Sequence, residues 1–170
     1  MHNKETLYVI DDDDKKIIVY EDEKKILEVT HHGWVFGRSY SRFYLNGELI
    51  LESSMNPFIE IFGSIAYRIK FQHLPSQLSL VSVWGHNRLQ YDGNVIEKHI
   101  EFYGSPFAQL YFNGEECGSI FRSNGDVELG VMRRFTAYLG LRPIDNLYLL
   151  IFFIIELSGR SVWPRLDFDA

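Results

Sequence analysis

The feature that most constrains this chain is the run at residues 147–155, nine consecutive residues that are all apolar. On the surface of a monomer, such a run would expose an apolar patch larger than soluble proteins tolerate. Asp145 or Asn146 is suited to cap the start of a helix here, and Ser158-Gly159 is suited to end it. A helix that is apolar on every side has to be buried on every side. A long central strand is the alternative, but the length of the run favours the helix.

The same run is too short to cross a membrane as a helix. A helix over residues 146–158 would extend about 20 Å, whereas the hydrocarbon core of a bilayer is about 30 Å thick. The N-terminal residues 1–5 carry no apolar signal core. We therefore predict a cytoplasmic protein without a transmembrane span, and the length of 170 residues predicts a single domain over residues 1–170.

The rest of the chain has the pattern of many short strands. Aromatic residues make up 15% of the sequence, which favours strands, and Asn-Gly or Asp-Gly pairs recur where hairpin turns need positive φ. About a dozen strands at this spacing predict an antiparallel β barrel, mainly β, closed around the C-terminal helix. The predicted strands are residues 7–10, 17–20, 25–29, 34–36, 42–45, 48–51, 58–62, 66–71, 78–84, 95–102, 108–112, 118–121 and 127–132.

One segment occurs twice. Residues 44–48 (YLNGE) recur 67 residues later as residues 111–115 (YFNGE), each in a strand, turn, strand context. Two explanations are open: a true internal duplication, or two hairpins that independently meet the same turn requirement.

Two segments resemble the tubby-like superfamily, in the branch shared by plant LURP-one proteins and phospholipid scramblases. They are residues 108–122 (AQLYFNGEECGSIFR), similar to a strand, glycine turn, strand unit, and residues 145–156 (DNLYLLIFFIIE), similar to a closing helix. In organisation the resemblance extends over residues 15–158. It implies a 12-stranded barrel around a central hydrophobic helix and a non-enzymatic binding role, since tubby proteins bind phosphoinositide head groups.

Basic residues form two small groups that suit an anion. Arg133 and Arg134 precede the apolar run and Arg142 follows closely, while Arg68 and Lys70 share one face of a predicted strand. If folding brings these five together, they form a site for a phosphate or a carboxylate. The first functional hypothesis is therefore a non-enzymatic domain that binds an anionic small molecule or a phospholipid head group. Ordinary surface positions are the alternative for these residues.

Acidic residues are concentrated near the N-terminus. Net charge is −6, which argues against nucleic acid as a partner. We interpret both acidic runs as solvated turns, with a surface for a basic protein as the alternative. That alternative gives the second hypothesis, an immunity or antitoxin-like inhibitor that binds a toxin protein. The candidate partner-binding residues are Asp11, Asp12, Asp13, Asp14, Glu21, Asp22 and Glu23.

Nothing local indicates catalysis, a cofactor or a metal. Cys117 follows two carboxylates, which would raise the pKa of its thiol and disfavour a nucleophile. His99 and Glu101 share a strand face but lack a third ligand at a recognisable spacing. An enzyme, the third hypothesis, would need carboxylates and histidines such as His86 that only folding brings together.

Overall fold

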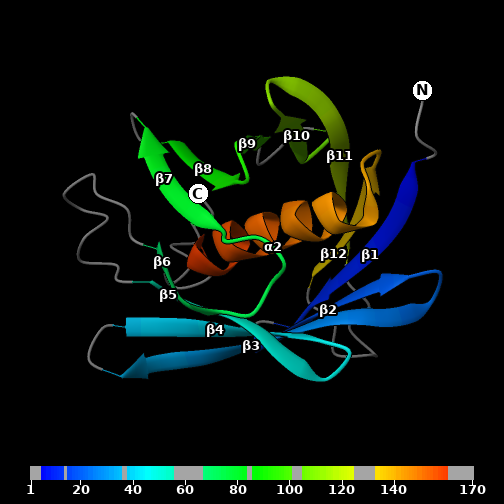
Figure 1. Cartoon of the computed structure of the whole chain (residues 1–170). Helices are drawn as coiled ribbons and strands as arrows, with labels where there is room; N and C mark the ends of the chain where they lie inside the picture. Colours follow the sequence, from blue (N-terminus) through cyan, green and yellow to red (C-terminus); the bar gives the residue numbers. More distant parts are fainter. Residues whose placement is uncertain are drawn as a thin grey trace, which may run out of the picture.

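Helix α2 (Pro143–Arg160) lies inside a wall of strands in the computed structural model of the chain (Figure 1). The structure describes residues 5–13, 15–35, 38–55, 67–83, 86–100, 105–124 and 133–160. The prediction of a helix is confirmed, and α2 extends beyond the expected residues 146–158 at both ends. From Tyr148 to Ile155 every side chain is at most 1% exposed.

The wall is a single antiparallel sheet of 12 strands within the described residues. This confirms the predicted fold class, a mainly β barrel around a C-terminal helix. The strands are β1 (Thr6–Asp12), β2 (Lys16–Glu21), β3 (Lys24–Val35), β4 (Arg38–Leu45), β5 (Glu48–Met55), β6 (Tyr67–Gln72), β7 (Ser79–Val83), β8 (His86–Tyr91), β9 (Asn94–Ile100), β10 (Ala108–Phe112), β11 (Glu115–Asn124) and β12 (Arg133–Leu139).

The barrel is nearly closed. Neighbouring strands in the chain pair with each other, β1 pairs with β12, and β6 and β7 are the two edges of the sheet. Between these edges, the side-chain amide of Gln72 donates to the carbonyl of Leu78 (3.2 Å) and accepts from its N–H (2.7 Å). The Gln72 side chain therefore makes the two hydrogen bonds, one donated and one accepted, that a paired strand would make through its backbone.

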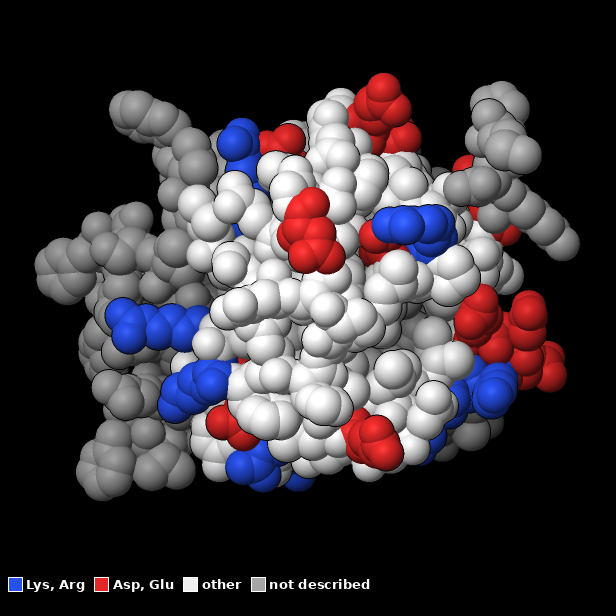
Figure 2. Space-filling model, viewed as in Figure 1, with Lys and Arg blue, Asp and Glu red and all other residues white. Residues whose placement is uncertain are grey.

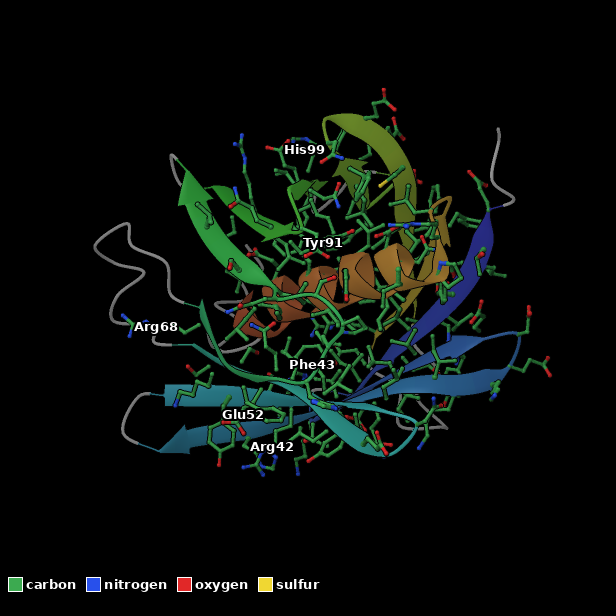
Figure 3. The ribbon with its side chains drawn as sticks, in the orientation of Figure 1. Arg42, Phe43, Glu52, Arg68, Tyr91 and His99 are labelled. Atoms are coloured by element: carbon green, nitrogen blue, oxygen red, sulfur yellow. The ribbon has the colours of Figure 1, made fainter. Side chains whose placement is uncertain are left out.

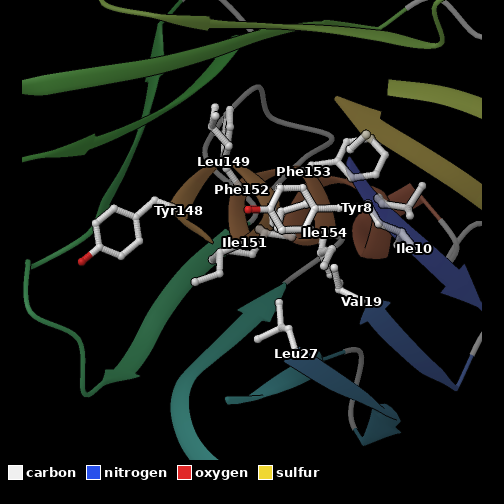
Figure 4. Close-up of a cluster of buried hydrophobic side chains, with 14 of the residues drawn as sticks. Tyr8, Ile10, Val19, Leu27, Tyr148, Leu149, Ile151, Phe152, Phe153 and Ile154 are labelled. Atoms are coloured by element: carbon white, nitrogen blue, oxygen red, sulfur yellow. The ribbon is translucent and has the colours of Figure 1, made fainter. Parts of the chain in front are cut away.

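The core is the space between α2 and the inner face of the sheet. Alternate residues of each strand point inward, as the period of a strand requires. Figure 4 shows Ile10, Val19 and Leu27 of three strands around the side chains of the helix. All three are fully buried, so α2 has apolar partners on this side.

The two similar segments have the same geometry. They are the turns of β4–β5 and β10–β11, the fourth and fifth strands of each half of the chain. Asn46 and Asn113 have φ of 50° and 52°, and the glycines that follow have φ of 86° and 84°. Both hairpins shift register at the equivalent place, after Phe43 in one and after Leu110 in the other. The β2–β3 hairpin has the same shift, after Val19, and the same positive φ at its turn, so these features do not decide between duplication and independent convergence.

Several strand predictions need correction. Residues 34 and 35 continue β3 instead of forming a strand of their own, and β8 and β12 were not predicted. Both missed strands contain charged residues that interrupt the apolar alternation: Arg88 in β8, and Arg133 and Arg134 in β12. The predicted strands at residues 58–62 and 127–132 lie outside the described residues.

Antiparallel alternation divides the barrel into two ends. The turns β2–β3, β4–β5, β8–β9 and β10–β11 and the start of α2 lie at one end, which we call the turn end. Strand β12 begins and α2 ends at the other, which we call the far end (Figure 1). Within the part of the chain that the structure describes, no helix has both the length and the apolar character needed to cross a bilayer.

Ile151 gives a direct test of the central helix. Ile151→Asp would bury a carboxylate among apolar side chains, so we expect it to lower the free energy of unfolding by about 4 kcal/mol or more. Phe152→Asp should also lower the free energy of unfolding, but by a smaller amount. Lys98 Nζ lies 5.3 Å from the centre of the Phe152 ring, so a cation is near the new carboxylate. Urea denaturation followed by circular dichroism measures both.

The matched control is Phe71→Asp, because Phe71 is 46% exposed on β6. It should change the free energy of unfolding by less than about 1 kcal/mol. An Ile151→Asp variant as stable as the Phe71→Asp control would contradict the central position of α2.

Candidate functional site

The two adjacent arginines of β12 point to opposite sides of the wall. Arg133 lies on the inner side, where its Nη2 is 2.5 Å from Oδ2 of Asp12, and these side chains are only 15% and 2% exposed. Arg134 lies on the outer side and donates to both carboxylate oxygens of Asp11, at 2.6 and 3.1 Å. The register of β1 and β12 places each pair directly opposite. These arginines therefore hold β1 against β12 and do not form one anion site.

Arg142 is at the turn end, away from the other predicted cations. Its Nε donates to Oδ2 of Asp145 in the first turn of α2 (2.6 Å), and the Tyr91 hydroxyl donates to Oδ1 (2.7 Å). The bond to Asp145 raises the pKa of Arg142. Burial first, and this carboxylate second, raise the pKa of Tyr91. The cluster anchors the start of the helix.

Arg68 and Lys70 remain available at the surface. Both are exposed on β6, on the outer side, as predicted from their spacing, while Ile69 between them packs against the core. Arg68 is paired in register with Ser54 of β5. Within the described residues neither cation has an ion pair with a carboxylate. Figure 3 shows the Arg68 side chain pointing away from the barrel.

The predicted acidic surface is divided between the two ends of the barrel. Asp11 and Asp12 lie in β1 instead of in a turn, since Arg134 and Arg133 opposite them compensate their charge. Asp13 Oδ1 accepts hydrogen bonds from the backbone N–H groups of Lys15 (3.1 Å) and Lys16 (2.6 Å). Asp14 lies outside the described residues.

The second acidic run forms the β2–β3 turn at the turn end. Asp22 and Glu23 have φ of 48° and 63°, so this run is a turn, as predicted, and Glu21 ends β2. Strand β2 separates the two acidic runs, and only the second consists of solvated turn residues. The basic-protein interpretation therefore has no single acidic face in the described residues.

A buried ion pair at the far end was missed by the sequence analysis. Lys98 of β9 points inward, and its Nζ lies 2.7 Å from Oε2 of Glu156 on α2, with side chains 8% and 6% exposed. Asn87 of β8 donates to the other oxygen of Glu156 (2.6 Å). A lysine between Ile96 and Ile100 and a glutamate ending an apolar run were the signals that could have found it. The pair fixes the end of the helix to the wall.

Polar inner residues continue around the far end. His31 Nδ1 is 2.8 Å from the Ser41 hydroxyl, and Ser41 and Ser53 are buried. Together with the ion pairs of Arg133 and Lys98, they replace the apolar lining found elsewhere in the core. In these two ion pairs the charges balance, because two cations face two carboxylates.

Cys117 is held as a thiol. Burial raises its pKa to about 12, and the charge of Glu116 adds to the effect. Its Sγ donates to the carbonyl of Leu110 at 3.4 Å. A thiol in this state is a weak nucleophile at neutral pH.

The histidine candidates do not converge in the described part of the chain. His99 is exposed on β9, whereas Glu101 and the side chain of His86 lie outside the description. Among the residues that the structure describes, no group of three or more His, Cys, Asp or Glu side chains is placed to hold a metal ion.

A groove of about 510 Å³, lined by both apolar and polar side chains, lies over the outer side of β3 and β4. Glu28 is one of the lining residues and is bound by Lys25 (2.8 Å) and Lys16 (3.1 Å). The bond from Lys25 is the main reason that the pKa of Glu28 is lowered. Basic and acidic side chains are likewise interspersed around a mostly uncharged centre on the face in Figure 2. Arg68 and Lys70 differ from Lys16 and Lys25 in having no ion pair with a carboxylate among the described residues.

Comparison with known proteins identifies no relative: no family model, curated protein or solved structure matches the chain.

The two arginines of β12 allow a matched test of their structural roles. Arg133→Met leaves the buried Asp12 carboxylate without this guanidinium, so we expect a loss of about 3–5 kcal/mol in the free energy of unfolding. Arg134→Met breaks a partly exposed pair and should cost about 1 kcal/mol or less. Urea denaturation of both variants measures the difference, and equal losses would contradict the inward position of Arg133.

Alkylation tests the state of Cys117. Because its pKa is raised to about 12, only a minute fraction is thiolate at pH 8. We expect iodoacetamide to modify the native protein at least about tenfold more slowly than the protein unfolded in urea, whose thiol has an ordinary pKa. Mass spectrometry measures the rates, and equal rates would contradict the buried thiol.

Proposed function

We propose that this protein is a non-enzymatic binding domain that takes an anionic ligand, a phosphate or phospholipid head group, at Arg68 and Lys70. The observation that carries the proposal is the contrast among the five predicted cations. Arg133, Arg134 and Arg142 each contact a carboxylate of the chain. Arg68 and Lys70 are exposed on one side of β6 and have no such contact among the described residues.

The neighbourhood of these two cations suits an anion. Ser54 lies opposite Arg68 in the sheet, so a hydroxyl is available beside the guanidinium. On the next strand, Arg42 is already bound to Glu52 at 2.8 Å, which leaves that carboxylate compensated. Figure 3 shows Arg42 and Glu52 close together. Because their charges cancel, Arg68 and Lys70 give the described part of β5 and β6 a positive charge, in a chain whose net charge is −6.

The architecture supports a binding role of tubby-like type. A 12-stranded wall around an apolar helix is what the resemblance implies, and α2 fills the interior with side chains. A ligand is therefore expected on the outside of the wall. The protonated Cys117 thiol is not an activated nucleophile, so catalysis through this residue is disfavoured.

A pair of double variants with the same change of charge tests the proposal. Arg68→Ser/Lys70→Ser removes the proposed site. Lys15→Ser/Lys24→Ser removes two other exposed lysines, which have no ion pair among the described residues. Because each cation near an anionic membrane contributes about 1 kcal/mol, the first variant should bind about thirtyfold more weakly.

Binding is measured by sedimentation with vesicles of phosphatidylcholine containing phosphatidylserine, against phosphatidylcholine alone. Calorimetry with inositol hexakisphosphate separates a soluble phosphate ligand from a membrane surface. Equal losses in the two double variants would mean that only total charge matters, and would contradict a site at β6. Failure of the unmodified protein to bind either probe would overturn the proposal.

A further inference from the structure

A second surface on the outer side of the barrel is apolar and lies away from β6. It crosses β2, β1, β12 and β11, which are neighbours in the sheet. Leu7, Phe121 and Tyr138 are 44%, 38% and 39% exposed, which is high for large apolar side chains. We call this surface the β1–β12 face; its residues are Leu7, Val9, Asp11, Ile18, Tyr20, Phe121, Arg134, Thr136 and Tyr138.

The residues of the face stand in rows set by the strand registers. Tyr20, Val9, Thr136 and Phe121 follow one another across the four strands, because each is paired with the next. Leu7 is opposite Tyr138 in the adjacent row, and the ring of Tyr138 meets that of Phe121 edge to face, with centres 5.9 Å apart.

The third row carries the charges. Asp11 and Arg134 lie opposite each other, with the guanidinium bonded to both carboxylate oxygens. Strands β1 and β12 therefore carry one acid and one base at the same height on either side of their junction. The face as a whole is neutral, in a chain with a net charge of −6.

This arrangement is self-complementary about an axis along the β1–β12 junction. A two-fold rotation about that axis places β1 of one copy over β12 of the other. Asp11 then faces Arg134 of the second copy, Leu7 faces Tyr138, and Tyr20 faces Phe121. No like charges meet, and the two sheets pack with aligned strands.

From this symmetry we infer that the β1–β12 face is the interface of a two-fold dimer of this chain. The neutrality of the face supports a second copy as the occupant. A basic partner would be favoured by an acidic patch, whereas two copies with a net charge of −6 each approach with least repulsion through a neutral, matched surface. The inference does not depend on the proposed anion site, which is on β6.

Exchange of the facing charges tests the symmetry. In Asp11→Arg the facing residues become arginine against arginine, and in Arg134→Asp they become aspartate against aspartate. We expect each variant alone to dimerise at least about tenfold more weakly than the unmodified chain. An equimolar mixture of the two should form a heterodimer with recovered affinity, since each Arg then faces an Asp. A structural effect within one copy would not be reversed by mixing.

Sedimentation velocity over a concentration series measures the dimers, and native mass spectrometry identifies the heterodimer. Phe121→Lys should also weaken the dimer at least about tenfold. Phe71→Lys is its control, because Phe71 is exposed on β6, outside the face. Melting temperatures show that each variant is folded. Three results would overturn the inference: a monomer at every concentration, a dimer unaffected by Phe121→Lys, or a mixture of the charge variants that does not recover affinity. The first of these would mean that the face binds a different partner.

Discussion

The structure depends on the burial of helix α2. Its residues 148–155 are apolar on every side and almost without exposure, so they need contacts in all directions. A single sheet surface covers only one side of a helix, whereas a sheet that curls into a barrel surrounds it. The 12 strands and their near closure at β6 and β7 follow from this requirement. The buried pair of Lys98 and Glu156 then fixes how far the helix extends into the barrel.

A filled interior limits where function can be. Side chains of α2 and the wall occupy the space that a hollow barrel would offer to a ligand. The far end is polar, but its ion pairs are balanced within the chain. On the outer side of the wall, two areas of the described residues differ in chemistry: β6 carries exposed cations, and the β1–β12 face is neutral and apolar. Separate areas allow an anion and a second copy to bind without competition.

Much of the fold could be predicted because it follows from local rules. The apolar run specified a buried helix, and Asn-Gly pairs specified hairpins at Asn46 and Asn113. Strand β12 was missed because its charges, Arg133 and Arg134, hide the alternation of Phe135, Ala137 and Leu139. The candidate site was harder, since five cations at distant positions were predicted to meet and only Arg68 and Lys70 share a surface. Which acid compensates which base depends on strand register, and local sequence does not specify that.

By itself the sequence determined the kind of elements and the need to enclose the helix, because residue periodicity and turn chemistry act over a few neighbouring residues. The tertiary structure alone decided which charges are neutralised. Asp11 and Arg134 are 123 residues apart in the chain, and they meet because β1 and β12 close the two halves of the sheet against each other. The same pairing turned the apparent acidic and basic clusters into ion pairs. It also left Arg68 and Lys70 without an ion pair among the described residues. Arg68 is opposite Ser54 on β5, and Glu52, the acid on β5 next to Lys70 in the register, is bound to Arg42 instead.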